Sequence, residues 1–442
     1  MTTATQDMSA GDTATSLPRL LPRGGQLAED WHTHTARHGR LPYRERPGDL
    51  VRDLNAAGLT GRGGAAFPVA RKLSAVLDAA AKRRRAPVVV ANGAESEPAS
   101  DKDATLLWLA PHLVLDGLQL MAEAAGAQAA ILYFHTDRRN DVGRRLRQAV
   151  AERAAVVADR VAVQLAEAPP RFLSGQETAL ISHLAGGPAI PTFVPPRITE
   201  RGLDGGPTLV QNVETLAHVA LIARHGPAWF RQVGTKTEPG SMLCTIRRAD
   251  GAVRITEVPL GMPLKSLIAS PDWQSLGPDR ALLVGGYHGT WVPAAAASRL
   301  TLDNHSLGAI GARVGAGILV TPPPDRCGLV ETAAVVRYLA LESAGQCGPC
   351  LNGLPRIAAG LTELATGRPR RQTQADIERW AGQVTGRGAC HHPDGTARFV
   401  RSALITFAAE VDRHNQGRCS GTNKKPFLPI PHGSARTEED WL

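Results

Sequence analysis

The pattern of apolar and polar positions divides the chain into stretches of different architecture. Between residues 41 and 235, short apolar runs alternate with longer segments of helical length. The short runs are rich in Val, Ile and Ala, and they predict buried strands at 86–93, 129–134 and 161–165. The longer segments predict helices at 69–80, 111–126 and 141–158. This alternation favours a parallel α/β sheet that binds ligands beyond the carboxyl ends of its strands.

The pattern changes after residue 235. Residues 236–322 predict a small α+β module of short strands around one short helix. The strands are predicted at 241–246, 253–258, 263–269, 281–286 and 290–292. Residues 323–414 predict a bundle, with helices at 330–344, 351–365, 374–382 and 397–413. The polar or proline-containing ends predict a flexible N-terminal tail at 1–40 and a C-terminal tail at 415–442.

Composition narrows the class of protein. The chain has 442 residues, of which 43% are hydrophobic, but no apolar run reaches the roughly 18 residues that a membrane span needs. Six cysteines in a chain of this length do not suggest a disulfide scaffold, and the N-terminus lacks the pattern of a secretion signal. These features predict a cytoplasmic protein. The net charge is +9, yet basic and aromatic residues are not interleaved, which argues against nucleic acid as a partner.

One glycine-rich stretch and two polar loops are the candidates for binding. Residues 58–68 carry four glycines and Arg62 directly before a predicted helix. Free backbone N–H groups at such a place can hold a phosphate, although a tight surface turn has the same pattern. The loop 92–98 carries two carboxylates after a predicted strand, and residues 209–215 carry amides that suit a heterocycle's edge or a helix cap.

The cysteines suggest a metal centre in the predicted bundle. Cys347 and Cys350 form a Cys-Gly-Pro-Cys pair between two predicted helices, and Cys390 precedes the last helix. The pair is compatible with half of an iron–sulfur site, half of a zinc site, a redox dithiol or two unrelated thiols. Zinc would take His391 as a fourth ligand, whereas a cluster would take Cys327 or Cys419.

Four motifs together resemble a known family. They are Gly-Leu-x-Gly-Arg-Gly-Gly-Ala-x-Phe-Pro (58–68), Asn-x-x-Glu-Ser-Glu-Pro (92–98), Ser-Gly-x-Glu-Thr-Ala-Leu (174–180) and Asn-Val-Glu-Thr (212–215). Their order resembles the NADH-binding flavoprotein (F) subunit of respiratory complex I and the related diaphorase subunits. The resemblance implies a multidomain α/β protein with a Rossmann-like FMN domain (41–235), a β-grasp module of the SLBB type (236–322) and an iron–sulfur four-helix bundle (323–414).

The resemblance also assigns cofactors and residues. It implies FMN contacts at Gly61, Arg62, Gly63, Gly64, Lys72, Asn92, Glu95, Gly175, Glu177, Asn212 and Thr215. Phe67 and Glu97 would lie nearest a nicotinamide nucleotide, NAD(H). Cys347, Cys350 and Cys390 would bind a [4Fe–4S] or [3Fe–4S] cluster, with Cys419, Cys327 or His391 as the fourth ligand.

The chain departs from the family where the dinucleotide binds. Ala94 replaces an Asp, Gln176 a Glu and Gln211 an Asn, and an aromatic residue is absent near Ala75. The family's Lys-Pro-Pro-Phe is Val-Pro-Pro-Arg at 194–197, and its first cluster cysteine is Ala344. Each lost contact removes about 1–3 kcal/mol of binding. The phosphate loop is kept, so these departures favour FMN binding over NADH use.

Three functions are therefore compatible with the sequence. The first is an NADH dehydrogenase-like oxidoreductase subunit that moves electrons from FMN through the cluster to a ferredoxin or another redox subunit. The second is a non-catalytic electron-transfer or docking subunit that keeps only the cluster, and the third is a zinc-stabilised structural relative. The protein would be cytoplasmic, or peripheral on the inner face of the membrane as part of a membrane complex.

Overall fold

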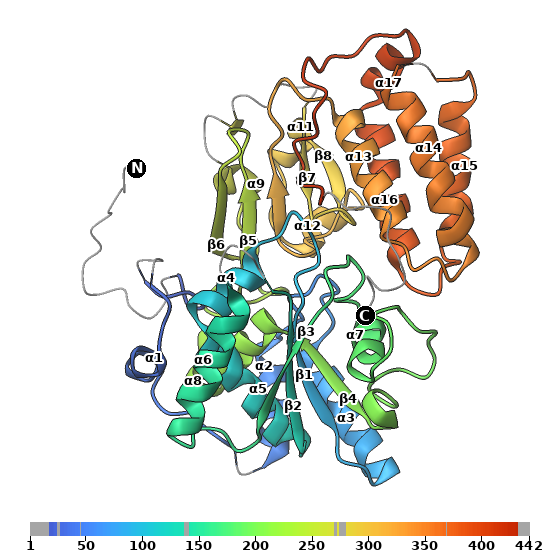
Figure 1. Cartoon of the computed structure of the whole chain (residues 1–442). Helices are drawn as coiled ribbons and strands as arrows, with labels where there is room; N and C mark the ends of the chain where they lie inside the picture. The colour runs from blue at the N-terminus through green and yellow to red at the C-terminus, as the bar shows by residue number, and fades with distance from the viewer. Residues whose placement is uncertain are drawn as a thin grey trace, which may run out of the picture.

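The computed structural model describes residues 17–23, 27–44, 46–136, 141–268, 272–273, 280–367 and 369–431. Figure 1 shows an α/β domain in the lower half, a smaller sheet above it and a helical bundle beside that sheet. The ends of both predicted tails, 1–16 and 432–442, lie outside the described residues.

The α/β domain contains a parallel sheet of strand order β3–β2–β1–β4. Its strands are β1 (Val88–Gly93), β2 (Ala129–Phe134), β3 (Val163–Glu167) and β4 (Thr208–Asn212). The first three fall where the apolar runs predict them. The sequence does not predict β4 as a strand, because its second half, Gln211 and Asn212, is polar.

Helices cover both faces of this sheet. They are α2 (Pro47–Ala57), α3 (Val69–Arg83), α4 (Lys102–Leu109), α5 (Pro111–Ala125), α6 (Val142–Ala155), α7 (Glu177–Leu184) and α8 (Val213–Phe230). Val89 and Ala91 of β1 pack into the core of α2, α3, α5 and α8, whereas Val90 faces Leu180 of α7. Helices α5 and α8 touch so closely that a Cβ at Gly117 would lie 1.9 Å from the carbonyl oxygen of Leu216.

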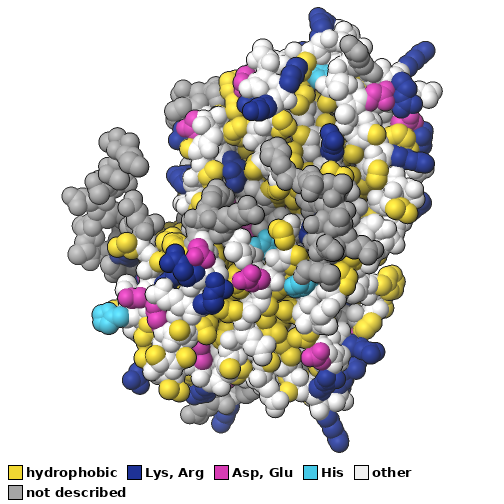
Figure 2. Space-filling model, viewed as in Figure 1, with side chains coloured by type: hydrophobic (Ala, Val, Ile, Leu, Met, Phe, Trp, Pro, Cys, Tyr) yellow, Lys and Arg dark blue, Asp and Glu magenta, His cyan; other side chains and the backbone are white. Residues whose placement is uncertain are grey.

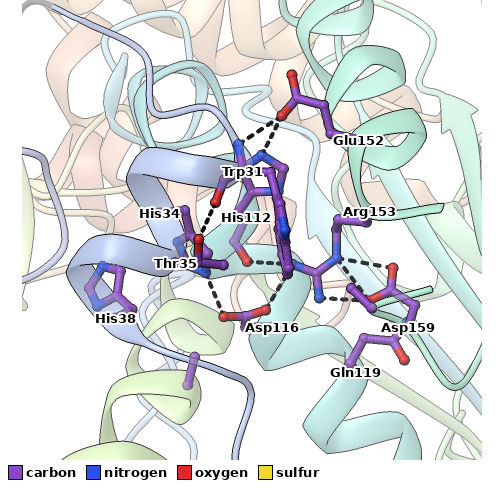
Figure 3. Close-up of polar contacts among 12 residues, drawn as sticks. Trp31, His34, Thr35, His38, His112, Asp116, Gln119, Glu152, Arg153 and Asp159 are labelled. Atoms are coloured by element: carbon purple, nitrogen blue, oxygen red, sulfur yellow. Dashed lines mark hydrogen bonds and ion pairs between the residues drawn. The ribbon is translucent and has the colours of Figure 1, made fainter. Parts of the chain in front are cut away.

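The described part of the predicted N-terminal tail is packed rather than flexible. Helix α1 (Trp31–His38) lies against α5 and α6 through buried charges (Figure 3). The Asp116 carboxylate accepts hydrogen bonds of 2.8 Å from His34 Nε2 and from Arg153 Nη1, and it also pairs with Arg224. A single carboxylate thus joins α1, α5, α6 and α8, and no local sequence pattern reveals this long-range pairing.

The small module is a mixed sheet of order β6–β5–β9–β7–β8. Its strands are β5 (Ser241–Arg247), β6 (Val253–Pro259), β7 (Ala281–Val284), β8 (Thr290–Pro293) and β9 (Ile318–Val320), with the short helices α9 (Leu264–Leu267), α11 (Ala294–Ala297) and α12 (Asn304–Gly308). The strand predicted at 263–269 is wrong over its described part. Leu264 and Leu267 are both buried, and their spacing of three residues fits one helical turn.

The C-terminal region is a helical bundle. It contains α13 (Gly328–Leu341), α14 (Leu354–Ala365), α15 (Thr373–Val384), α16 (His392–Thr406) and α17 (Ala408–Asn415). The single helix predicted at 397–413 is broken at Phe407, which separates α16 from α17. Residues 416–431 of the predicted C-terminal tail pack back onto the bundle, because the buried carboxylate of Glu331 accepts hydrogen bonds from the backbone N–H groups of Phe427 and Leu428.

On the face drawn in Figure 2, Lys and Arg side chains project from both halves of the molecule and alternate with carboxylates. Among the described residues, no single helix is long and apolar enough to cross a membrane. The bent pair α4–α5 meets the length and composition test together, and most of its residues are buried in the core of the α/β domain.

Candidate functional site

Two asparagines mark the carboxyl edge of the parallel sheet. Asn92 is the second-last residue of β1, Asn212 ends β4, and the two residues are direct partners in the ladder. Asn92 Nδ2 donates to the carbonyl oxygen of Gly175 at 2.8 Å, and Asn212 Oδ1 accepts from the Glu214 N–H as the N-cap of α8. Three of the motifs identified in the sequence therefore meet where ligands of parallel sheets bind.

The glycine-rich loop lies beside this pair. It links α2 to α3, and its ends are joined by a hydrogen bond of 2.9 Å from the Gly61 N–H to the Phe67 carbonyl oxygen. A Cβ on Gly63 would lie 3.3 Å from the Cβ of Asn212, so glycine lets the loop approach the sheet edge. Gly64 has φ +99°, which side chains rarely adopt. The loop thus forms a backbone-lined wall, and Phe67 at its end is 43% exposed.

The Arg62 side chain points into the protein. Its guanidinium is buried and donates to the carbonyl oxygens of Ser241, Pro239 and Thr60. Its backbone N–H donates to Thr215 Oγ1 at 2.8 Å. The Arg62 side chain therefore ties the loop to the small module, and a role of Arg62 in binding FMN stays a prediction. Thr215, another predicted contact, holds the loop from the α8 side.

Lys72 and Glu177 face each other across the sheet edge. Lys72 Nζ on α3 pairs with Glu177 Oε1 at the start of α7, and the Lys72 side chain is 15% exposed. Gly175, two residues earlier, packs so tightly that a Cβ would lie 2.7 Å from the Ala94 carbonyl oxygen. The loop after β1 therefore packs against the loop before α7, and the ammonium group of Lys72 lies beside them, where it pairs with Glu177.

Two buried carboxyl groups lie in the loop after β1. Glu95 accepts from the backbone N–H groups of Asp103 and Ala104 at the start of α4, and burial and the nearby Asp103 raise its pKa to about 7. Glu97 accepts from the Tyr287 N–H at 3.0 Å, and burial raises its pKa to about 7. Oε1 of Glu97 is buried and lacks a hydrogen-bond partner among the described residues.

A buried cluster of charged side chains contacts the carboxyl edge of the sheet through Asn212, and the sequence does not predict it. Lys102 Nζ contacts Asp103 Oδ1 at 2.6 Å and Glu214 Oε2 at 2.8 Å, and all three side chains are almost fully buried. Asp103 Oδ2 in turn accepts from Asn212 Nδ2 at 2.7 Å. The only signal in the sequence is the charged run 101–103 ahead of an apolar helix, which is equally typical of an exposed helix start.

The residues that differ from the family have other partners or none. Gln176 Oε1 caps α7 by accepting from the N–H groups of Thr178 and Ala179. Gln211 is buried, and its Nε2 lacks a partner among the described residues. Ala75 lines a shallow groove between α2 and α3 together with the small side chains of Ala70 and Ser74. An adenine ring therefore finds no aromatic partner at Ala75.

Three cysteines meet at one end of the bundle. Cys350 lies in the helical turn Pro349–Gly353 and is buried, and the neighbouring thiols of Cys347 and Cys390 add to burial in raising its pKa. Such a group of thiols suits a metal that stabilises thiolates. Ala344 packs against the same core. Its methyl group replaces the thiol that the family has at this position.

None of the three proposed fourth ligands joins these cysteines in the described structure. Cys327 precedes α13, whereas Cys347 follows it, and a helix of 14 residues separates its ends by about 20 Å. Cys419 lies within 4.8 Å of the Cys327 ligand atom, at that distant end. The His391 side chain is fully exposed and pairs with Asp394 at 3.4 Å.

The residues present fit the cofactors that the resemblance implies. The sheet edge offers a glycine wall, a lysine, and two buried polar atoms without partners among the described residues, Glu97 Oε1 and Gln211 Nε2. The bundle offers three thiols in one place. Three thiolates suit a [3Fe–4S] cluster, or a [4Fe–4S] cluster with one iron open to an external ligand.

Comparison with known proteins agrees with this interpretation of both sites. Residues 54–221 match the family model of the Nuo51 FMN-binding domain, and residues 331–414 match the NADH-ubiquinone oxidoreductase-F iron–sulfur binding region. One relative is the F-type subunit (F 2) of the NADH-quinone oxidoreductase of Rhizobium meliloti (strain 1021), which is 30% identical over 387 residues that cover 84% of this chain and 90% of the relative. The corresponding F-type protein of Streptomyces coelicolor is 28% identical over 389 residues, which cover 84% of each chain.

A solved structure shows the same fold. An NAD⁺-reducing [NiFe]-hydrogenase in its H₂-reduced state superposes with a TM-score of 0.74 at 28% sequence identity. The match covers 83% of this chain and 63% of the hydrogenase chain. The chain thus spans just under two thirds of the length of that relative.

Proposed function

Because the chain belongs to the family of F subunits of NADH-quinone oxidoreductases, we propose that it is an oxidoreductase subunit whose flavin exchanges electrons with a protein partner rather than with free NADH. The chain has an FMN-binding domain and an iron–sulfur binding region, and it is an electron-transfer subunit. The proposal concerns the donor, the residues and the exit route. One observation carries it: the glycine-rich loop and Lys72 line the sheet edge, while the groove between α2 and α3 has the methyl group of Ala75 where the family has an aromatic side chain.

The residues of the sheet edge would bind and orient FMN. The N–H groups of the glycine-rich loop and Lys72 would hold the phosphate, and the Asn92 and Asn212 amides would face the ring system. Bound FMN accepts two electrons and releases them singly. Glu95 and Glu97 have pKa values raised to about 7, so each holds a proton on a carboxyl oxygen for part of the time at neutral pH.

We infer a protein as the electron donor because several residues that bind the dinucleotide in the family are replaced in this chain. Gln176 Oε1 already caps α7, and Ala94 and Ala75 offer only methyl groups where the family has a carboxylate and an aromatic ring. Together these losses remove several contacts of about 1–3 kcal/mol each. A small redox protein such as a ferredoxin needs none of them, because it delivers electrons without binding in the groove.

The cysteine end of the bundle would be the exit to a partner redox subunit. Leu341 is 61% exposed and Leu351 is 64% exposed, and they lie on either side of Cys347 and Cys350 in the chain. Exposed apolar side chains beside a metal centre are typical of an interface. The relatives named above are subunits of larger redox enzymes, which supports a partner at this surface.

Reduction by competing donors tests the proposal. The protein is purified without oxygen, its iron and flavin are quantified, and its flavin absorbance is followed after NADH or a reduced ferredoxin is added. We expect FMN and about three to four irons per chain, bleaching by the ferredoxin, and bleaching by NADH at least 100-fold slower.

Three results would contradict the proposal. Rapid bleaching by micromolar NADH would show that the dinucleotide half is intact. Iron without flavin would favour an electron-transfer subunit that keeps only the cluster, and zinc at the three cysteines would favour a structural relative. The variant Ala75→Phe is the matched gain-of-function control, since an added ring should strengthen NADH binding if the groove is the deficient part.

A further inference from the structure

Four metal-binding side chains meet at the end of the bundle remote from Cys347. They are Cys327, Glu410, His414 and Cys419, and one ligand atom from each lies within 4.8 Å of the others. Cys327 precedes α13, Glu410 and His414 lie one turn apart on α17, and Cys419 follows α17. Figure 1 shows α17 at the end of the bundle away from the α/β domain. The cluster therefore joins three segments that the chain separates by up to 92 residues, from 327 to 419.

Three of the four ligand atoms have the spacing of a tetrahedral metal site. Cys327 Sγ lies 3.5 Å from His414 Nε2 and 3.6 Å from Glu410 Oε1, and the last two atoms are 3.2 Å apart. Zinc bonds are about 2.3 Å to sulfur and about 2.0–2.1 Å to nitrogen or oxygen. Tetrahedral angles then separate sulfur from nitrogen or oxygen by about 3.5 Å, and nitrogen from oxygen by about 3.3 Å. The observed distances agree with these values.

A hydrogen bond behind His414 orients its ring for metal binding. His414 Nδ1 lies 2.9 Å from the carbonyl oxygen of Leu364, and a carbonyl can only accept, so Nδ1 carries the proton. In the neutral ring Nε2 is then a lone-pair donor, and it is the atom that faces Cys327 and Glu410. Such a bond from the second ring nitrogen to a carbonyl is typical of histidines that bind metal ions.

The surroundings complete the site. The backbone N–H groups of Leu329 and Val330 donate to the Cys327 sulfur, and a Cβ on Gly421 would lie 2.7 Å from the Cys327 nitrogen. Glycine is thus required for residues 419–421 to close over Cys327. Glu410 Oε1 also accepts from the Ser420 N–H at 2.7 Å, and Oε2 pairs with Arg413 at 2.9 Å.

We propose that Cys327, Glu410, His414 and Cys419 form a closed structural site for zinc that fastens the C-terminal segment to the bundle. A set of two sulfurs, one nitrogen and one oxygen within 4.8 Å of one another favours zinc over the hard cations magnesium and calcium. Two thiolates, one carboxylate and Zn²⁺ leave one negative charge, which Arg413 balances. Binding releases the two thiol protons to solvent, and no redox change is involved.

Metal analysis of two cysteine variants separates this site from the iron–sulfur centre. Zinc and iron per chain are measured by mass spectrometry of the metals in the wild type, in Cys419→Ser and in Cys350→Ser, after purification with zinc in the medium. We expect one zinc in the wild type, at least a tenfold loss of zinc with retained iron in Cys419→Ser, and the converse in Cys350→Ser. Glu410→Gln, which removes one ligand charge while keeping the shape, should weaken zinc retention against a chelator.

A second measurement covers the case in which Cys419→Ser does not fold. Zinc is removed from the wild type with a chelator, and trypsin cleavage after the exposed Lys424 is compared before and after zinc chloride is added back. We expect cleavage to accelerate on removal and to slow again on readdition. Absence of zinc from the wild type, a Cys327–Cys419 disulfide in peptide mapping, or loss of iron in Cys419→Ser would each overturn the proposal.

Discussion

At the scale of the residue, Ala344 decides which cluster the bundle can hold. The family pattern has a cysteine here, and the three cysteines that remain provide three thiolates at one place. Cys327 and Cys419 cannot replace the missing thiol, because α13 separates them from Cys347 by about 20 Å. With these three cysteines as its ligands, the proposed centre would be either a three-iron cluster or a four-iron cluster with one open iron.

This assignment predicts opposite effects of two substitutions. Cys350→Ser removes one of three thiolates and should lower iron to less than about one tenth of the wild-type content. Ala344→Cys supplies a fourth thiolate and should give a cluster that withstands air longer, with iron content nearer four per chain. Iron analysis and low-temperature electron paramagnetic resonance check both results. Unchanged iron in Cys350→Ser would contradict the ligand assignment.

His135 gives a second prediction at this scale. The Ser174 hydroxyl donates its proton to the backbone carbonyl oxygen of Arg171, so its oxygen accepts from His135 Nε2, 2.8 Å away. Burial lowers the pKa of His135 to about 4. The unfolded chain has a histidine pKa of about 6.5. Between these values the unfolded chain binds the extra proton, so stability should rise with pH from about 4 to about 6.5.

The effect of His135 is measurable by difference. One proton amounts to about 1.4 kcal/mol per pH unit, or about 3 kcal/mol over this window. We expect His135→Gln to remove that slope, so that wild type and variant converge or cross as the pH falls from about 7 to about 4. Urea unfolding with FMN at one fixed, saturating concentration measures it. Parallel curves for the two proteins would count against a neutral buried His135.

At the scale of the element, the glycine-rich loop depends on Arg62 as a tie rather than as a ligand. The buried guanidinium donates to the carbonyl oxygen of Thr60 in the loop itself and to those of Pro239 and Ser241 in the small module. Arg62→Lys keeps the charge but cannot donate in several directions at once, so it should cost about 2–4 kcal/mol of stability and weaken FMN binding at least tenfold. Fluorescence titration with FMN and thermal unfolding measure both. Lys72 also lies at this sheet edge, but the side chain of its partner Glu177 is exposed. Lys72→Ala should therefore weaken FMN binding with little loss of stability.

Elements with a uniform pattern are predictable from this sequence, and elements fixed by distant partners are not. Strand β2 is a continuous apolar run, β1 begins with one at 88–91 and β3 is mostly apolar, so the sequence locates these three strands. The second half of β4 is polar and the apolar run of β9 is only three residues long, so neither gives a clear signal. The apolar positions of α9 have the spacing of a helical turn rather than that of a strand. Local preference is weak where packing decides.

The same distinction holds for the candidate site. The sequence motifs bring Asn92, Gly175 and Asn212 to attention, and the structure joins them at one sheet edge. The sequence cannot reveal that Arg62 turns toward the small module, because its carbonyl partners are about 180 residues away. The sequence also cannot show that Cys327 and Cys419 lie far from Cys347, because this depends on the direction of α13 in the structure.

At the scale of the whole molecule, residues 423–431 connect the bundle to the small module. The N–H groups of Phe427 and Leu428 donate to the two carboxyl oxygens of Glu331 at 2.8 and 3.0 Å, and the Tyr287 hydroxyl donates to the Pro429 carbonyl oxygen. Burial raises the pKa of Glu331, so the two donors offset part of the cost of its charge. The segment therefore stabilises the orientation of the bundle relative to the small module, which are called the two lobes below.

A double-mutant cycle tests this connection. In Glu331→Gln, the amide NH₂ meets a backbone N–H that needs an acceptor, which should cost about 1–3 kcal/mol in the full chain. In a chain that ends after Thr422, both backbone donors are absent while Cys419 and Gly421 remain, so the same substitution should cost close to nothing. Trp291 of the small module donates to Thr332 of α13 at 3.0 Å, and its fluorescence during urea unfolding reports on the contact between the lobes. An equal cost of Glu331→Gln in both chains would show that Glu331 acts within the bundle alone and that the segment does not join the lobes.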